Sequence, residues 1–139
     1  MDILQSGSKM KVACAYLCDY GDRNDYFMSL MPWGLCSIAA CLEQEHHAVI
    51  LANLSQHGAI KGAEILLAEE PDVVAVSIFS FNRTDSFRLI RELKRRNGNL
   101  IIIVGGQHPT FLHEQVLSEY PEIDHIVKGE GESATVELL

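Results

Sequence analysis

Five short apolar runs alternate along the chain with segments whose apolar residues recur at helical spacing, and this alternation restricts the fold more than any other feature. The runs cover residues 11–17, 48–52, 72–79, 100–104 and 124–127, and the helical segments cover 32–46, 58–70, 84–96, 112–119 and 132–139. Continuous apolar runs of this length favour strands covered on both faces. Short strand-to-helix connections require right-handed crossovers and therefore a parallel sheet. We predict an α/β, flavodoxin-like (Rossmann-like), doubly wound five-stranded parallel sheet in the order 2-1-3-4-5.

The three longer helical segments each carry an apolar stripe that should face the sheet. The residues expected on these stripes are Leu35, Ile38, Ala39 and Leu42, then Ile60, Ala63, Leu66 and Leu67, then Phe87, Ile90 and Leu93. Residues 1–10 form a polar leader, and 11–139 should form one domain. Because the chain stops within its last predicted helix, we expect it to be the N-terminal piece of a longer protein.

Charge and hydropathy exclude several classes of partner. The 139 residues carry 19 acidic and 11 basic side chains, a formal net charge of −8, so we expect no nucleic-acid partner. No apolar stretch approaches the length of a membrane span, and the N-terminus lacks the order of a secretory signal. We therefore expect a cytoplasmic protein without a membrane partner.

The cysteines and histidines do not predict a metal site. Cys14, Cys18, Cys36 and Cys41 form no C-x-x-C pair, and they should be reduced thiols in small apolar positions. Cys14 and Cys18 alone would offer only two ligands on one face of a strand. Most of the six histidines are expected on the surface.

A ligand of a doubly wound sheet lies beyond the carboxyl ends of the strands, so the loops at that edge hold the candidate site. The loop at residues 18–31 is polar, and Asp19 and Tyr20 are candidate binding residues in it. We expect this loop to be the most mobile part of the chain, because its side chains have little to pack against without a ligand.

The third strand ends in a polar segment. Ser77 is the one hydroxyl in an otherwise apolar strand end, and Phe79, Ser80 and Asn82 follow it at the rim. These four residues are candidate ligand contacts. A lone serine at such a position also serves to bond a neighbouring backbone carbonyl, and both roles remain open.

Glycines follow the fourth and fifth strands. Gly105 and Gly106 leave no side chain in the way of a long ligand, although a tight turn would also account for them. Gln107 and His108 follow at the same rim, where His108 would either contact the ligand or cap a helix. After the fifth strand, the candidate binding residues are Lys128, Gly129, Glu130 and Gly131. The other role open to Glu130 is to complement the dipole of the helix that follows.

Three common classes of α/β protein lack their key residues here. The loop after the first strand has no Ser- and Thr-rich phosphate loop for FMN and no G-x-G-x-x-G for a dinucleotide. A phospho-receiver domain could use Asp19 and Lys128, but the end of the third strand, S-I-F-S-F-N, has no carboxylate to accept the phosphoryl group.

Four segments, in order and spacing, resemble a known family. They are P-W-G-L-x-S-I-A-A-x-L at residues 32–42, P-D-V-V-A-V-S at 71–77, I-V-G-G-Q-H-P-T at 103–110 and I-D-H-I-V-K-G-E-G-E at 123–132. Together they resemble the cobalamin (B12)-binding domain at the N-terminus of radical S-adenosylmethionine (radical SAM) proteins. The resemblance implies a corrin ring on the carboxyl edge of the sheet. It also implies a nucleotide tail that enters near Ser77-Ile78-Phe79, where Phe79 replaces a leucine, and near Gly105-Gly106.

The chain departs from other cobalamin proteins in one respect. The Asp-x-His-x-x-Gly motif, whose histidine ligates cobalt from below, has no counterpart after the first strand, and residues 18–27 contain no histidine. The resemblance therefore implies cobalamin without a histidine from this loop below the cobalt. A module that has kept the fold but lost the cofactor, and that serves in docking or substrate recognition, is the alternative.

The chemistry implied by the resemblance lies outside this chain. The cluster motif C-x-x-x-C-x-x-C is absent, so the chain cannot itself cleave S-adenosylmethionine. The full-length protein would be a radical SAM enzyme that also carries a 4Fe-4S cluster and S-adenosylmethionine in a downstream domain, with methyl transfer or a related radical reaction as its activity.

Overall fold

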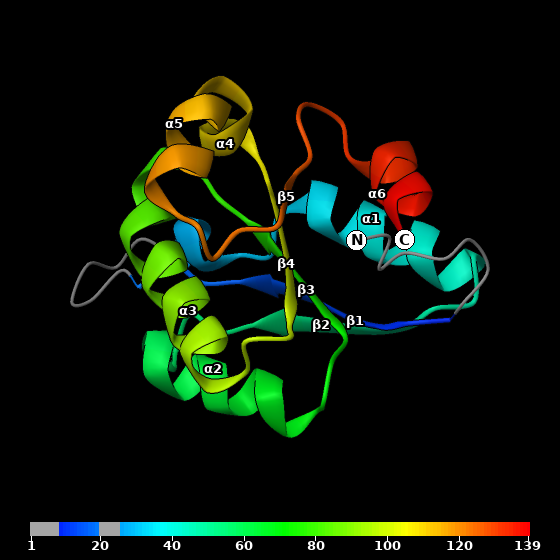
Figure 1. Cartoon of the computed structure of the whole chain (residues 1–139), viewed down its shortest axis with the longest axis horizontal. Helices are drawn as coiled ribbons and strands as arrows, with labels where there is room; N and C mark the ends of the chain where they lie inside the picture. The colour runs from blue at the N-terminus through cyan, green and yellow to red at the C-terminus, as the bar shows by residue number, and fades with distance from the viewer. Residues whose placement is uncertain (1–8, 20–25) are drawn as a thin grey trace.

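The computed structural model describes residues 9–19 and 26–139, which form a five-stranded sheet with helices on both faces (Figure 1). Every strand pair is parallel, and the order is β2-β1-β3-β4-β5, as predicted. The strands are β1 (Lys11–Tyr16), β2 (Ala48–Asn53), β3 (Val73–Ser77), β4 (Ile101–Gly105) and β5 (His125–Ile126). The carboxyl ends of β1, β3 and β4 therefore meet at one edge in the middle of the sheet.

Helices α1 (Trp33–Gln44) and α6 (Glu132–Leu138) cover one face, and α2 (Gly58–Ala68) and α3 (Arg83–Arg96) cover the other (Figure 1). The short α4 (Gln107–Phe111) and α5 (His113–Glu119) follow β4, and two 3₁₀ turns, η1 (Tyr26–Ser29) and η2 (Ser80–Asn82), lie in the loops after β1 and β3. None of the helices in the described ranges is long and apolar enough to cross a membrane.

The core consists of two apolar layers, because successive strand residues point to opposite faces. Ala13, Ala15 and Leu17 face α2 and α3, whereas Val12, Cys14 and Tyr16 face α1. All six are buried, which confirms the prediction of a central strand covered on both faces.

One sequence-based expectation about the helices was wrong. Ile60 was expected to face inward but is 60% exposed, because the inner face of α2 consists of Ala59, Gly62, Ala63 and Leu66. A Cβ on Gly62 would lie 3.1 Å from Leu54, so the close contact of this face depends on small residues rather than on Ile60. The short helix expected over 112–119 is present as α5, and the structure adds α4 at 107–111, which was not expected.

Hydrogen bonds attach the described part of the loop after β1 to the sheet. The Tyr16 hydroxyl donates to the Met28 carbonyl, and Asn53 Nδ2 donates to the Ser29 carbonyl at 2.6 Å. These two bonds attach η1 to the edge of the sheet. The polar segment 20–25, including the candidate Tyr20, lies outside the described residues, so the expectation of high mobility in this loop remains a prediction.

Asn82 joins the ends of two central strands. Its side chain is fully buried, and its Nδ2 donates to the carbonyls of Leu17 at 2.9 Å and Ser77 at 3.3 Å. Its Oδ1 accepts from the backbone N–H of Phe79 at 2.7 Å. The amide is therefore used within the fold, where it fixes the rim of the sheet.

Replacing Asn82 with Ala should lower the free energy of unfolding by about 2–3 kcal/mol, because the Phe79 N–H and two carbonyls lose a buried partner. Denaturant unfolding measures this change. The matched control is Ser80→Ala at an exposed position of the same turn, which should stay within about 0.5 kcal/mol of the parent. An Asn82→Ala protein as stable as the control would show that the rim does not depend on this amide.

A buried thiol should make the fold sensitive to alkaline pH. Burial, and then the neighbouring Cys36 and Glu43, raise the pKa of Cys14 from its ordinary value of 9.0 to about 12. Above pH 9 the unfolded chain releases this proton and the folded chain keeps it, so the contribution to stability is present below pH 9 and is lost as the pH rises towards 12. Burial also raises the pKa of Tyr16, so a variant is needed to isolate the thiol.

Cys14→Ala should therefore have a free energy of unfolding that falls less steeply between pH 8 and pH 10.5 than that of the parent. Urea titrations at several pH values in this interval measure the slopes. The same slope in both proteins would show that Cys14 releases its proton equally in the folded and unfolded states.

Candidate functional site

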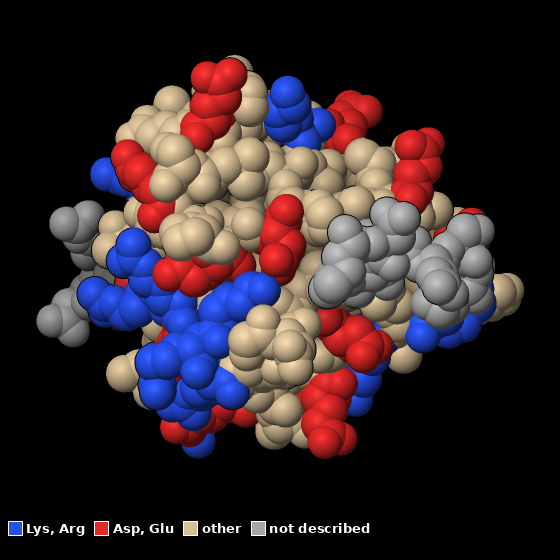
Figure 2. All heavy atoms as spheres, in the orientation of Figure 1, with Lys and Arg blue, Asp and Glu red and all other residues tan. Residues whose placement is uncertain are grey.

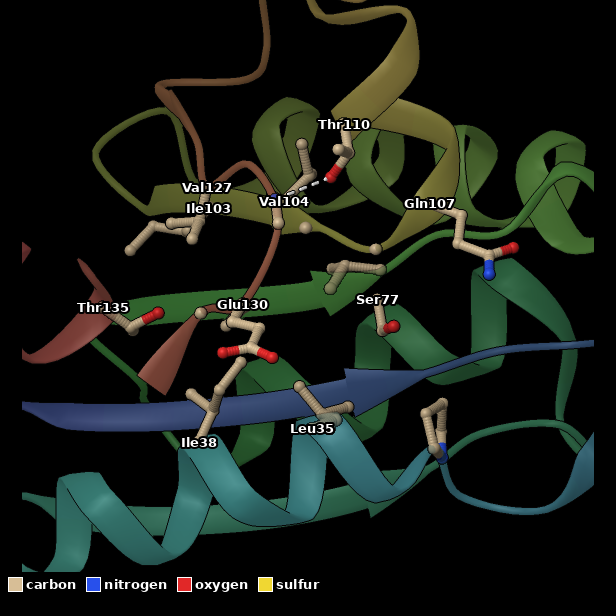
Figure 3. Close-up of a pocket in the computed structure, with 18 of the residues that line it drawn as sticks. Leu35, Ile38, Ser77, Ile103, Val104, Gln107, Thr110, Val127, Glu130 and Thr135 are labelled. Carbon is tan, nitrogen blue, oxygen red and sulfur yellow. Dashed lines mark hydrogen bonds between the residues drawn. The ribbon is translucent and has the colours of Figure 1, made fainter. Parts of the chain in front are cut away.

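A cavity of about 450 Å³ opens at the carboxyl edge of the sheet, between the ends of β3 and β4 and the helices α1, α4 and α6 (Figure 3). Its inner wall is apolar, and the side chains that form it are Leu35, Ile38, Ala75, Ile103 and Val127. Its volume lies within the range of cavities that hold small organic ligands. The cavity is on the α1 side of the sheet, directly beneath the rim at which the sequence predicted a ligand.

Small residues and diverging elements create this space. Ala75 and Gly105 occupy positions on the α1 face of β3 and β4 where larger side chains would fill the gap. The loop from β5 to α6 passes over the opposite side, and Thr110 Oγ1 of α4 accepts a hydrogen bond from the Gly129 N–H at 3.0 Å, which fixes this loop (Figure 3). Gly129 has φ = +71°, a conformation that favours glycine.

The two glycines after β4 have different roles. Gly106 has φ = +103°, and a Cβ there would lie 2.6 Å from the carbonyl oxygen of Ile78, so the turn itself requires glycine. Ile78 donates to the Gly105 carbonyl at 2.8 Å and accepts from the His108 N–H at 3.1 Å, which holds the two strand ends together. At Gly105 φ is not positive, and a Cβ would lie 3.5 Å from the Val127 carbonyl, an ordinary contact. Of these two glycines, Gly106 is therefore required by the turn. Gly105 is not, so the absence of a side chain at Gly105 can instead give a ligand access to the backbone.

Polar groups border the cavity at a few places. Ser77 is buried at the end of β3, and Thr135 is buried on α6. Glu130 is exposed at the border of the cavity, and in the view of Figure 3 its carboxylate lies close to Ile38 of α1. An apolar wall with a few polar groups at the border is typical of a site for a largely apolar ligand that carries a polar end.

Eight of the candidate residues come together around this cavity. They are Ser77, Phe79, Gly105, Gly106, Gln107, Gly129, Glu130 and Gly131. Five others do not line it: Asp19, Ser80, Asn82, His108 and Lys128. Asp19, Ser80 and Lys128 are exposed at the same edge, where a ligand larger than the cavity would extend, and Asn82 is used by the fold. The binding roles of all of these residues remain predictions.

His108 points to the other side of α4. Its ring meets the edge of Phe87 at 5.9 Å between centroids, and burial together with the charge of Arg83 lowers its pKa. The imidazole therefore favours its neutral form.

Apart from Gln107, sequence reasoning missed the residues that α1, α4 and α6 contribute to the cavity. Pro32, Gly34 and Leu35 line it from the first turn of α1, Thr110 and Phe111 line it from α4, and Glu132 and Thr135 line it from α6. The segment P-W-G-L was among the motifs of the resemblance, but no binding role was given to it. The signal was available in Pro32 and Gly34, which reduce side-chain bulk where a helix begins.

Large apolar side chains are exposed on the elements that border the cavity. Trp33 is 92% exposed, Phe111 is 80% exposed, and Phe79 stacks on the half-exposed Phe81 with ring centroids 5.2 Å apart. Exposed apolar surface concentrated at one edge of a sheet indicates a surface that is covered in the working protein. Among the residues that the structure describes, no group of three or more His, Cys, Asp or Glu side chains is placed to hold a metal ion.

The fold and the cavity define a doubly wound ligand-binding domain, and the B12-binding domain family matches residues 26–139. The chain therefore belongs to the B12-binding domain family, and it is homologous to the B12 modules of cobalamin-dependent radical SAM enzymes.

Curated relatives agree with this assignment. The chain is 31% identical over 109 residues to an uncharacterised methyltransferase of Pyrococcus horikoshii, covering 78% of this chain and 24% of the relative. It is 33% identical over 115 residues to an anaerobic magnesium-protoporphyrin IX monomethyl ester cyclase of Synechocystis, covering 79% of this chain and 23% of the relative. Over 70 residues it is 33% identical to TokK, a cobalamin-dependent radical SAM methyltransferase of Streptomyces tokunonensis, covering 50% of this chain and 10% of the relative. The chain thus spans about a quarter of the first two.

A solved structure shares the fold. The cobalamin-dependent S-adenosylmethionine radical enzyme OxsB, with aqua-cobalamin and S-adenosylmethionine bound, aligns with a TM-score of 0.75 and 23% identity, covering 94% of this chain and 18% of that chain. This likeness supports the sheet order and the placement of the helices.

The residues present fit a cobalamin. The dimethylbenzimidazole base of its nucleotide tail is flat and apolar, which matches the wall formed by Leu35, Ala75 and Ile103. Its ribose and phosphate need polar partners at the border of the cavity. Gly105 offers an approach without a side chain, and Ser77 offers a hydroxyl.

Proposed function

We propose that this chain binds cobalamin, with the nucleotide tail in the cavity between β3, β4 and α1 and the corrin ring over the carboxyl edge of the sheet. The single observation that carries the proposal is the apolar cavity of about 450 Å³ at this edge of a B12-binding domain. Burial of the apolar base supplies most of the affinity, since the polar groups at the border exchange hydrogen bonds with water.

Particular residues would hold each part of the ligand. Ser77 would donate its hydroxyl to the tail, and Gly105 would let the tail pass close to the backbone. The exposed Trp33 and Phe111 would lie under or beside the corrin ring, whose apolar edges they can cover. When bound, cobalamin would supply a cobalt centre able to carry a methyl group.

The loop after β1 would place no imidazole below the cobalt. Residues 18–31 contain no histidine. We propose that the position below the cobalt is taken either by a weak ligand from the segment 19–26, which includes Asp19 and Tyr20, or by no protein ligand at all.

The proposal for the whole protein rests on the relatives. Since the chain spans about a quarter of two relatives, we place it within a longer cytoplasmic radical SAM enzyme whose downstream domain holds a 4Fe-4S cluster and S-adenosylmethionine. In this arrangement the present chain is the cofactor-binding module and has no catalytic residue of its own.

Gel filtration tests cobalamin binding directly. The purified chain is mixed with hydroxocobalamin at micromolar concentration, and the visible absorbance is followed through the protein peak. Corrinoid that travels with the protein and shows a shifted spectrum is the expected result. Protein free of corrinoid would instead favour the alternative, a fold that has lost the cofactor and serves in docking or substrate recognition.

A further inference from the structure

A second cavity, also about 450 Å³, lies on the opposite side of α4, between α3 and α5. It shares no lining residue with the cobalamin cavity. One wall carries four arginines of α3, which are Arg83, Arg88, Arg91 and Arg95. The cobalamin proposal uses none of these residues.

Two of these four arginines, Arg83 and Arg88, have no carboxylate partner in the part of the chain that the structure describes. Arg88 has no carboxylate partner among residues 9–19 and 26–139, and Arg83 donates only to a backbone carbonyl, that of Ser80. Arg91 lies 3.7 Å from Glu122 and over the ring of Tyr120, whereas Arg95 is paired closely with Glu92 at 2.6 Å. Figure 2 shows basic side chains gathered over α3, with acidic side chains beside them, on a protein whose net charge is −8.

The opposite wall is partly apolar, and the Glu119 carboxylate on it accepts a hydrogen bond from Gln115 at 3.0 Å. Leu112 is 41% exposed there, and Gln115 lies one turn further along. The floor is rigid, because the ring of Phe87 stacks on Tyr120 with centroids 3.8 Å apart. The guanidinium of Arg91 also lies over the Tyr120 ring, 5.0 Å from its centroid.

We propose that this groove is a docking site for an extended acidic segment of a partner protein. Arg83 and Arg88 would bind its carboxylates, since guanidinium groups pair with carboxylates through two parallel hydrogen bonds. Leu112 would contact apolar side chains that alternate with the acidic ones.

Length and charge favour a short peptide over other anions. From Arg83 to Arg95 the helix rises about 18 Å, which matches about six residues of extended chain. A single phosphate would contact only part of this stripe. A nucleic acid carries charge far beyond the groove, where the acidic remainder of the surface repels it.

The test is fluorescence anisotropy with a labelled peptide in which Glu and Leu alternate. We expect saturable binding to the purified chain at low salt and about tenfold or greater weakening by Arg88→Glu. Lys9→Glu is the matched control, because it makes the same change in net charge away from α3 and should have little effect. Both substituted positions are exposed, and thermal unfolding verifies that each variant is folded.

Three results would overturn the proposal. The first is no saturable binding of the peptide, and the second is equal weakening by Arg88→Glu and Lys9→Glu. The third is that a peptide with Gln in place of Glu, inorganic phosphate or a single-stranded oligonucleotide binds as tightly as the Glu–Leu peptide. Weaker binding of a peptide with Ser in place of Leu would support the role of Leu112.

Discussion

Replacing Gly105 with Val should weaken cobalamin binding by about a hundredfold or more, equivalent to about 3 kcal/mol, while the apo fold stays close to the parent in stability. Gly105 ends β4 on the face that lines the cavity, so two added methyl groups occupy the space assigned to the tail. A Cβ is tolerated there, because its nearest neighbour is the Val127 carbonyl at 3.5 Å and φ is not positive. Spectral titration with hydroxocobalamin measures the affinity.

The matched control for this variant is Ser77→Ala, which keeps the cavity open and removes one hydroxyl. It should weaken binding by tenfold or less, since one hydrogen bond contributes about 1 kcal/mol. If Gly105→Val is stably folded and binds cobalamin as tightly as Ser77→Ala, the tail does not pass this edge, and its assignment to the cavity is wrong.

Replacing Gly106 with Ala should lower the free energy of unfolding by about 3–5 kcal/mol. The residue would be held at φ = +103°, which costs about 1–3 kcal/mol for a residue with a side chain, and its Cβ would press on the Ile78 backbone at 2.6 Å. Because the neighbour is backbone, no side-chain rotation relieves this contact.

Gly98→Ala is the control, since the nearest atom to its Cβ is the Lys94 carbonyl oxygen at 4.0 Å and φ is not positive. It should stay within about 0.5 kcal/mol of the parent in urea unfolding. A Gly106→Ala protein as stable as Gly98→Ala would show that the strand-to-helix turn adapts to a side chain.

The sheet was predictable because its determinants are local in sequence. Each strand is a continuous apolar run such as Leu100–Val104, and short connections between alternating strands and helices leave few topologies. The error at Ile60 shows where periodicity fails. A small residue such as Gly62 counts as a gap in an apolar stripe, yet it is the point of closest packing against Leu54.

The site was predictable in part. The rim residues Ser77, Gly105 and Glu130 follow strands directly, so topology alone brings them to one edge. The side of the sheet on which the cavity opens was not predictable, because it depends on how α1 and α6 diverge from β3 and β4. Asn82 was a reasonable candidate from its position, but the three backbone groups that it satisfies become neighbours only after folding.

The most direct test of the cobalamin proposal compares cobalamin with cobinamide, which keeps the corrin ring and lacks the nucleotide tail. The affinity of each corrinoid for the parent and for Gly105→Val is measured by spectral titration. We predict that the parent binds cobalamin at least about tenfold more tightly than cobinamide, and that Gly105→Val binds the two equally. Equal affinity of the parent for both corrinoids would contradict the proposal that the cavity between β3, β4 and α1 holds the tail.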